Sequence, residues 1–158
     1  MSRLQREVKK KHPFQSLQQE AALNLARTSD RVGIEFERLF RGHGLTPSQY
    51  NILRILRGEA KPMPVLEIAS RTVTVVPGIT GLVDRLEKAD FVLRRRCTED
   101  RRVIYVEITA KGLEVLSDLD LPVLELHRRL MGHLPDSELK ELIRLLEKVR
   151  APLTEDAP

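Results

Sequence analysis

The stretch FVLRRRCTEDRRVIYVEIT, residues 91–109, decides the fold of this chain of 158 residues. Two runs, residues 91–95 and 103–108, have the apolar and β-branched composition of strands, and a short turn separates them. Residues 94–102 of this stretch carry five arginines against two carboxylates: the arginines are Arg94, Arg95, Arg96, Arg101 and Arg102, and the carboxylates are Glu99 and Asp100. We therefore predict a β-hairpin whose tip is strongly basic.

Helical periodicity surrounds this hairpin on both sides. Upstream, Thr46-Pro47 starts one helix and Pro77 another, and Gly33 lies inside a third, where it marks either a close approach or a tolerated defect. Downstream, Pro122 is expected to kink or split a long helix. The predicted helices cover residues 14–40, 46–58, 65–69, 77–89, 113–130 and the segment from about residue 135.

The order of these elements is typical of a winged helix-turn-helix, because two short helices joined by a turn precede a basic hairpin. We predict a mainly α fold with a small β-hairpin wing (α+β). The DNA-binding lobe is expected at residues 45–109, and helical dimerisation regions at 14–44 and 110–150. Residues 1–13, with Lys9, Lys10 and Lys11, are expected to form a flexible basic arm, and 151–158 a flexible tail.

Composition narrows the class of protein. One cysteine, Cys97, excludes an internal disulfide framework, and no apolar run is long enough to cross a membrane, so a cytoplasmic protein without membrane contact is expected. The four histidines, His12, His43, His127 and His133, lack metal-ligand spacing. We find no phosphate loop or nucleophile motif, and predict no enzymatic activity, no cofactor and no metal. Cys97 is interpreted as an incidental thiol rather than a redox switch.

The basic hairpin has two interpretations. It can be a solvated surface turn, as most charge runs are, or a contact to a polyanion. The helix before it begins with small residues, Pro77, Gly78, Thr80 and Gly81, which allow close approach to a phosphate backbone. Arginine also fits the narrow minor groove of DNA, where the potential is most negative. This context favours double-stranded DNA as the partner.

Residues 79–112, ITGLVDRLEKADFVLRRRCTEDRRVIYVEITAKG, resemble the signature of the MarR family of bacterial transcription regulators. The wing of that family reads Asp-x-Arg, then a strand ending in Leu-Thr or similar, then a charged residue and Gly. The residues that match in order are Asp100, Arg102, Val106, Ile108 and Thr109. LTPSQYNILRIL, residues 45–56, is similar to the second helix of the family, and Ile68-Ala69 to its third. The resemblance covers residues 14–150.

The resemblance implies a homodimer that presents two recognition helices to a pseudo-palindromic operator. Apolar faces on the first and last helices, which the short elements cannot cover alone, agree with a partner chain. The resemblance places Arg102 in the minor groove with Asp100 orienting it. The candidate DNA-binding residues are Val76, Pro77, Gly78, Thr80, Arg85, Arg94, Arg95, Asp100, Arg101 and Arg102; the candidate dimerisation residues are Phe14, Leu17, Leu139, Leu142, Leu146 and Val149.

The resemblance also implies a repressor rather than an activator, released by a small effector such as a phenolic or other aromatic acid. The ligand-binding residues stay unassigned. The chain departs from the family at Val76, the expected helix cap, and at Gly81, where a polar or basic residue is usual. An alternative is therefore a winged-helix protein-interaction module without sequence-specific DNA recognition.

Overall fold

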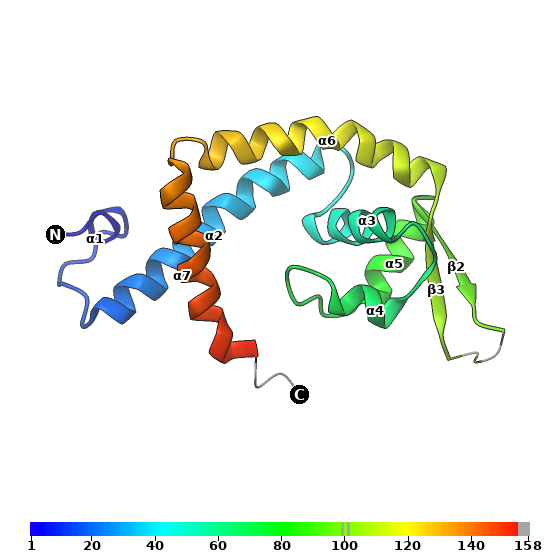
Figure 1. Ribbon diagram of the computed structural model, residues 1–158, viewed down its shortest axis with the longest axis horizontal. Coiled ribbons are helices and arrows are strands. Elements are labelled where there is room, and N and C mark those ends of the chain that lie inside the picture. Colours follow the sequence, from blue (N-terminus) through cyan, green and yellow to red (C-terminus); the bar gives the residue numbers. More distant parts are fainter. Residues whose placement is uncertain (99, 101, 155–158) are drawn as a thin grey trace. The chain divides into compact units, whose positions relative to one another are not determined.

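The computed structural model describes residues 1–98, 100 and 102–154 and is mainly helical (Figure 1). The chain forms two compact units, residues 1–120 and 121–158. The first unit holds α1 (Arg3–Glu7), α2 (Leu17–Arg41), α3 (Pro47–Glu59), β1 (Met63–Pro64), α4 (Val65–Ser70), α5 (Ile79–Lys88), β2 (Val92–Arg96), β3 (Ile104–Ile108) and the first part of α6 (Ala110–Met131). The second unit holds the rest of α6 and α7 (Asp136–Thr154). This mainly α architecture with a small sheet confirms the predicted fold class.

Side-chain caps set the starts of α2 and α3. Ser16 accepts a hydrogen bond from the backbone N–H of Gln19 at 3.1 Å. Thr46 and Gln49 form a reciprocal capping box, and Pro47 occupies the first helical position, where its missing N–H costs nothing. A Cβ added at Gly33 would meet no atom within 4 Å, so this glycine is a tolerated defect within α2.

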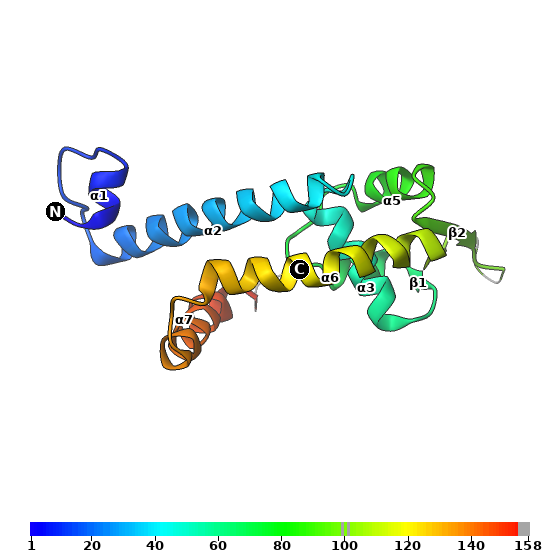
Figure 2. The ribbon, with the colours of Figure 1, turned by 90° about the horizontal axis from the view of Figure 1, so that it is seen from above.

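The sheet has three antiparallel strands in the order β1-β3-β2. β2 and β3 form the predicted hairpin, with Arg94 opposite Val106 and Arg96 opposite Ile104. The hairpin projects beyond the helices of its lobe (Figures 1 and 2). β1 was not predicted: Met63 pairs with Val106, so a segment that reads as a proline-rich turn adds a short edge strand.

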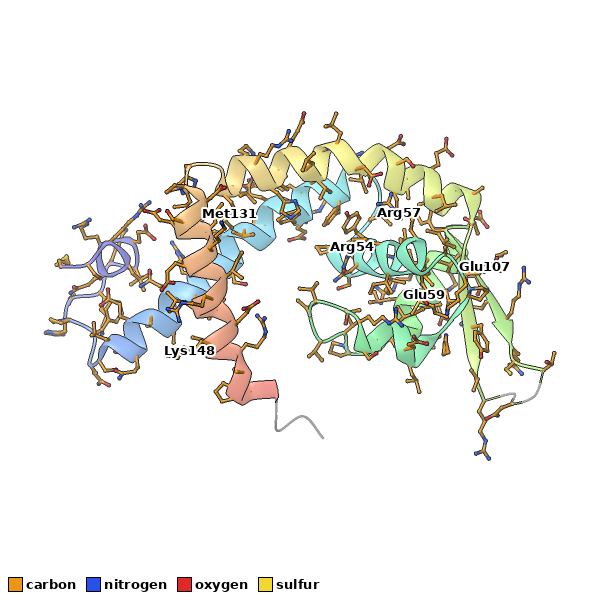
Figure 3. All side chains as sticks on the ribbon, in the orientation of Figure 1. Arg54, Arg57, Glu59, Glu107, Met131 and Lys148 are labelled. Atoms are coloured by element: carbon orange, nitrogen blue, oxygen red, sulfur yellow. The ribbon has the colours of Figure 1, made fainter. Side chains whose placement is uncertain are left out.

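The core of the lobe joins α3, α4, α5, the sheet and the start of α6. Its fully buried side chains are aliphatic: Ile52, Leu53, Leu56, Met63, Ile68, Val83, Leu86, Val92, Val106, Leu116 and Leu119. At its edge, Arg57 of α3 donates two hydrogen bonds to the Asp120 carboxylate of α6, at 2.9 and 2.7 Å. Arg57 lies between these two helices (Figure 3). The contact ties the first part of α6 to the lobe.

Two predictions about the ends of the chain need correction, and a third, at Pro122, is narrowed to one outcome. Residues 1–13 contain helix α1, in which Leu4 is 4% exposed. Helix α7 continues to Thr154, so the start of the predicted tail is helical, and residues 155–158 lie outside the described part. The sequence leaves two outcomes open at Pro122, a kink or a split, and α6 continues through Pro122 as one helix, so the split does not occur.

Two features are absent from residues 1–98, 100 and 102–154. No helix among them is long and apolar enough to cross a membrane. Within the same residues, no group of three or more His, Cys, Asp or Glu side chains could hold a metal ion.

Candidate nucleic-acid interface

Helix α5 begins later than the sequence predicts. Gly78 is its N-cap, with φ 70° and ψ 41°, and no side chain caps the helix. Glycine adopts this left-handed conformation without strain. Val76, the predicted cap, lies two residues before the observed cap and is half-buried. The start of α5 therefore presents backbone N–H groups without a competing side chain, as an approach to phosphate requires. Pro77, Gly78 and Thr80 are exposed there.

The turn of the wing is held by backbone hydrogen bonds. Cys97 N–H donates to the Val103 carbonyl at 2.9 Å, and Val103 N–H donates to the Asp100 carbonyl at 3.0 Å. The Asp100 carboxylate accepts a hydrogen bond from the backbone N–H of Arg102 at 2.9 Å. Asp100 thus positions the backbone of Arg102 and not, as predicted, its guanidinium.

Arg94 binds carboxylates within the chain rather than facing outward as a free cation. Its guanidinium pairs with Asp84 and, at 2.6 and 2.7 Å, with Glu87, both on α5. Its backbone N–H also donates to Glu87 at 3.1 Å. Hydrogen bonds from Arg94 lower the pKa of Glu87. These contacts fasten β2 to α5, and a phosphate contact by Arg94 stays a prediction.

The remaining arginines supply the outward charge. Arg95 lies 3.1 Å from the Glu107 carboxylate and is 67% exposed at its side chain. Arg85, Arg96 and Arg102 are exposed, and no other described residue forms an ion pair with them. Arg101 lies outside the described residues. The free positive charge thus lies on the outer face of α5 and on the hairpin.

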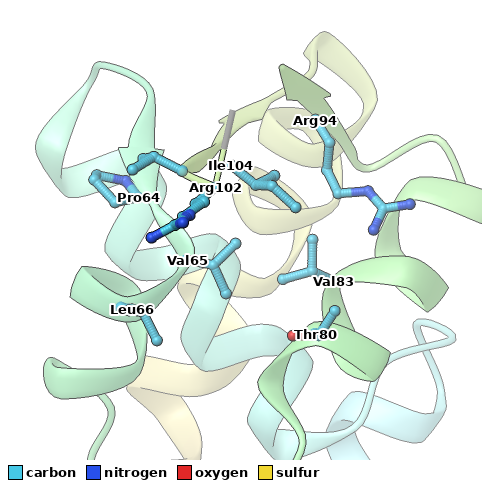
Figure 4. A pocket seen from close by; sticks show the side chains of 9 residues that line it. Pro64, Val65, Leu66, Thr80, Val83, Arg94, Arg102 and Ile104 are labelled. Atoms are coloured by element: carbon cyan, nitrogen blue, oxygen red, sulfur yellow. The ribbon is translucent and has the colours of Figure 1, made fainter. Parts of the chain in front are cut away.

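A hollow of about 290 Å³ separates α4 and α5 from the wing (Figure 4). Leu66, Val83 and Ile104 supply apolar walls, and Thr80 and Arg102 lie at its margins. Its surface is open, with α5 on one side and the wing on the other, so it is part of the face that the arginines surround. Sequence reasoning did not single out Leu66, because its place in a short helix does not show which way it points.

The predicted dimerisation residues are partly uncovered in the single chain. Leu17 is 82% exposed, Leu142 37% and Val149 56%, whereas Phe14, Leu139 and Leu146 are half-buried. Further apolar side chains are exposed on α2, α6 and α7: Leu23, Leu25, Leu121, Leu124, Ile143, Leu145 and Leu153. Isolated exposed leucines are ordinary, whereas several exposed apolar side chains along one helix are typical of a surface that contacts another protein.

Several known proteins are similar to this chain in sequence or in fold. The family model described as the MarR family matches residues 45–104. The chain is 31% identical over 140 residues to the HTH-type transcriptional regulator YkoM of Bacillus subtilis, covering 85% of this chain and 90% of that one. It is 28% identical over 113 residues to the homoprotocatechuate degradative operon repressor of Escherichia coli, covering 72% and 76%. The crystal structure of a MarR transcription factor from Planctomyces limnophilus is 47% identical, with a TM-score of 0.67 and coverage of 85% and 98%.

Proposed function

Because this chain belongs to the MarR family of transcription regulators, we propose that it is a homodimer that binds a pseudo-palindromic operator in double-stranded DNA and represses transcription. The relatives named above are transcription regulators, and none is an enzyme. They disfavour the alternative of a protein-interaction module.

The observation that carries the proposal is the contrast in charge within the lobe. Arg94 is neutralised by Asp84 and Glu87, while Arg85, Arg96 and Arg102 stay exposed and unpaired among the described residues. Arg85 lies on α5 and the other two lie on the hairpin, and the start of α5 lacks a side-chain cap. A helix end and a hairpin that both attract anions, on one lobe, suit the two grooves of a duplex.

The effector is proposed as an aromatic acid. One relative is named for an operon that degrades homoprotocatechuate, which is an aromatic acid. In a dimer, such a ligand would favour one spacing of the two DNA-binding lobes and shift the population away from the spacing that the operator needs. Half-sites about 10 bp apart are expected for this geometry.

The test is fluorescence anisotropy with the duplex upstream of the gene and a scrambled duplex of equal length, at about 150 mM salt. Preferential binding to the upstream duplex, weakened steeply by added salt, supports the proposal. Release by a panel of phenolic acids would support the effector. Equal weak binding to both duplexes, with an affinity that salt leaves unchanged, would contradict DNA recognition and favour the protein-interaction module.

A further inference from the structure

Exposed aliphatic side chains lie at the edge of the proposed DNA-binding face. Val73 is 79% exposed and Val75 is 94% exposed, both in the loop between α4 and α5. Leu66 of α4 is 81% exposed and lines the hollow with Thr80 and Arg102. We call Leu66, Val73 and Val75 the apolar rim. Their exposure removes any role in the core of this chain.

Side-chain hydrogen bonds hold the loop that carries the two valines. The Thr72 hydroxyl lies 2.8 Å from the carbonyl oxygens of both Ala69 and Thr74. Arg71, directly before it, pairs with Glu59 at 2.6 Å and also with Glu67. The single hydrogen of the Thr72 hydroxyl is shared between these two carbonyls, one at the end of α4 and one between the two valines, and it restrains the segment that carries Val73 and Val75.

Few side chains near the start of α5 can form hydrogen bonds with base edges. Between residues 73 and 82, the sequence VTVVPGITGL offers only the hydroxyls of Thr74 and Thr80. In the major groove, the one apolar group that distinguishes a base is the C5-methyl of thymine. Aliphatic side chains can discriminate thymine from the other bases by covering that methyl.

We propose that Val73 and Val75 read thymine methyl groups in each half-site. The inference rests on the proposed function, and it names how that function achieves specificity. The partner that contacts the two valines is DNA rather than an apolar protein surface, because the same lobe is positively charged. Arg85, Arg96 and Arg102 are exposed and unpaired among its described residues.

The experiment begins by selecting binding sites from a random-sequence duplex pool with the full-length protein. The enriched site is then prepared with thymine and with every thymine replaced by uracil, which removes only the methyl groups. We expect uracil to weaken binding by about tenfold or more, since each half-site loses at least one contact worth about fourfold.

Variants separate methyl contact from changes in the DNA itself. Val73→Ala/Val75→Ala should bind the thymine site more weakly and reduce the uracil penalty to about twofold. Val8→Ala is the matched control, because Val8 is an exposed valine, 46% exposed, that lies after α1. The control should keep the full penalty, and urea unfolding should show that all variants fold.

The outcomes distinguish the two proposals. Failure to enrich any site would overturn both sequence-specific binding and the methyl readout that depends on it. A site that is enriched but bound equally with thymine and uracil would overturn the readout alone. A penalty that persists unchanged in the double valine variant would also reject Val73 and Val75 as its origin.

Discussion

Arg94 and Arg102 belong to one hairpin, but carboxylates neutralise only the guanidinium of Arg94 among the described residues. Arg94 faces two carboxylates of α5, whereas Arg102 is exposed and has its backbone N–H, not its guanidinium, bound by Asp100. A guanidinium that already has partners must lose them before it binds phosphate, and a free one need not. Arg102 is therefore the better candidate for DNA contact, although both were predicted from the same run of charge.

Replacing Arg102 with alanine should weaken operator binding and lower the slope of log K against log salt by about one, because one fewer cation displaces counterions. Arg3→Ala is the control, because it removes the same charge from α1, where Arg3 pairs with Glu7 at 2.9 Å. Anisotropy titrations over a series of salt concentrations measure both slopes. Equal slopes for the two variants would remove Arg102 from the interface.

Gly112 is required by a close approach near the start of α6. A Cβ at this position would lie 2.4 Å from the Phe91 carbonyl oxygen and 2.7 Å from Ile108 Cγ1. Gly112→Ala should therefore lower the free energy of unfolding by about 1–3 kcal/mol through overpacking. The glycine that follows the wing in the MarR signature thus has a steric reason in this chain.

Gly58→Ala provides the opposite case for the same measurement. Gly58 lies within α3, and a Cβ there would meet no atom within 4 Å. Alanine should raise the free energy of unfolding by up to about 1 kcal/mol, because it favours helix more than glycine does. Urea unfolding of both variants would contradict the steric argument if Gly112→Ala proved as well tolerated as Gly58→Ala.

At the scale of elements, the contact of Glu87 with Arg94 fastens the wing to α5. The pKa of Glu87 is lowered in the folded chain, so the unfolded chain binds more protons at acidic pH. The stabilisation by Glu87 is therefore present above the ordinary glutamate pKa of about 4.3 and is lost as the pH falls through the lower folded value. Both side chains are about one-third exposed, which limits the contribution to about 1 kcal/mol at most.

Glu87→Gln should accordingly destabilise the protein at pH 7 and have a smaller effect at pH 3.5, because below the ordinary glutamate pKa of about 4.3 the unfolded chain takes up a proton and the stabilisation by the carboxylate declines. Urea midpoints of both proteins at the two pH values measure this difference. Glu114→Gln, at an exposed position on α6, controls for a general loss of negative charge. A difference between wild type and Glu87→Gln that stays constant with pH would show that the clamp is not ionic.

Local sequence signals predicted most elements and failed where a distant partner decides the structure. Periodicity and the Thr46-Pro47 start placed α3 correctly, and the β-branched run placed β3. β1 was not predicted, because a strand of two residues shows no alternation of apolar and polar side chains. Met63 belongs to a strand only because it pairs with Val106. The shift of the α5 N-cap from Val76 to Gly78 depends on a left-handed backbone conformation that glycine permits but does not enforce.

The candidate interface was predictable in outline but not in the state of its charges. The sequence shows five arginines, yet only the approach of β2 to α5 brings Asp84 and Glu87 to Arg94. The exposure of Val73 likewise depends on how the loop before α5 is held. Residue types are read from the sequence, whereas neutralisation and exposure come from packing between elements.

At the scale of the whole molecule, the apolar side chains that stay exposed on each unit support the proposed homodimer. In the second unit, Leu142, Ile143, Leu145, Val149 and Leu153 are all more than one-third exposed along α7. Burial of such side chains against a second copy would stabilise a dimer by roughly 25 cal/mol for each Å² of apolar surface removed from water. Operator recognition by two half-sites would then depend on this contact.

Val149→Asp should shift the protein toward monomer, because a carboxylate at a buried interface would lose its hydration without gaining a partner. Val149 is 56% exposed in the single chain, so each chain should still fold. Sedimentation velocity measures the assembly, and Ser137→Asp, at an exposed polar position near the start of α7, adds the same charge as a control. The monomeric variant should lose most of its operator affinity with its circular dichroism unchanged, since one lobe alone reaches only one half-site. A Val149→Asp protein that sediments as wild type and binds the operator normally would place the interface away from this end of α7.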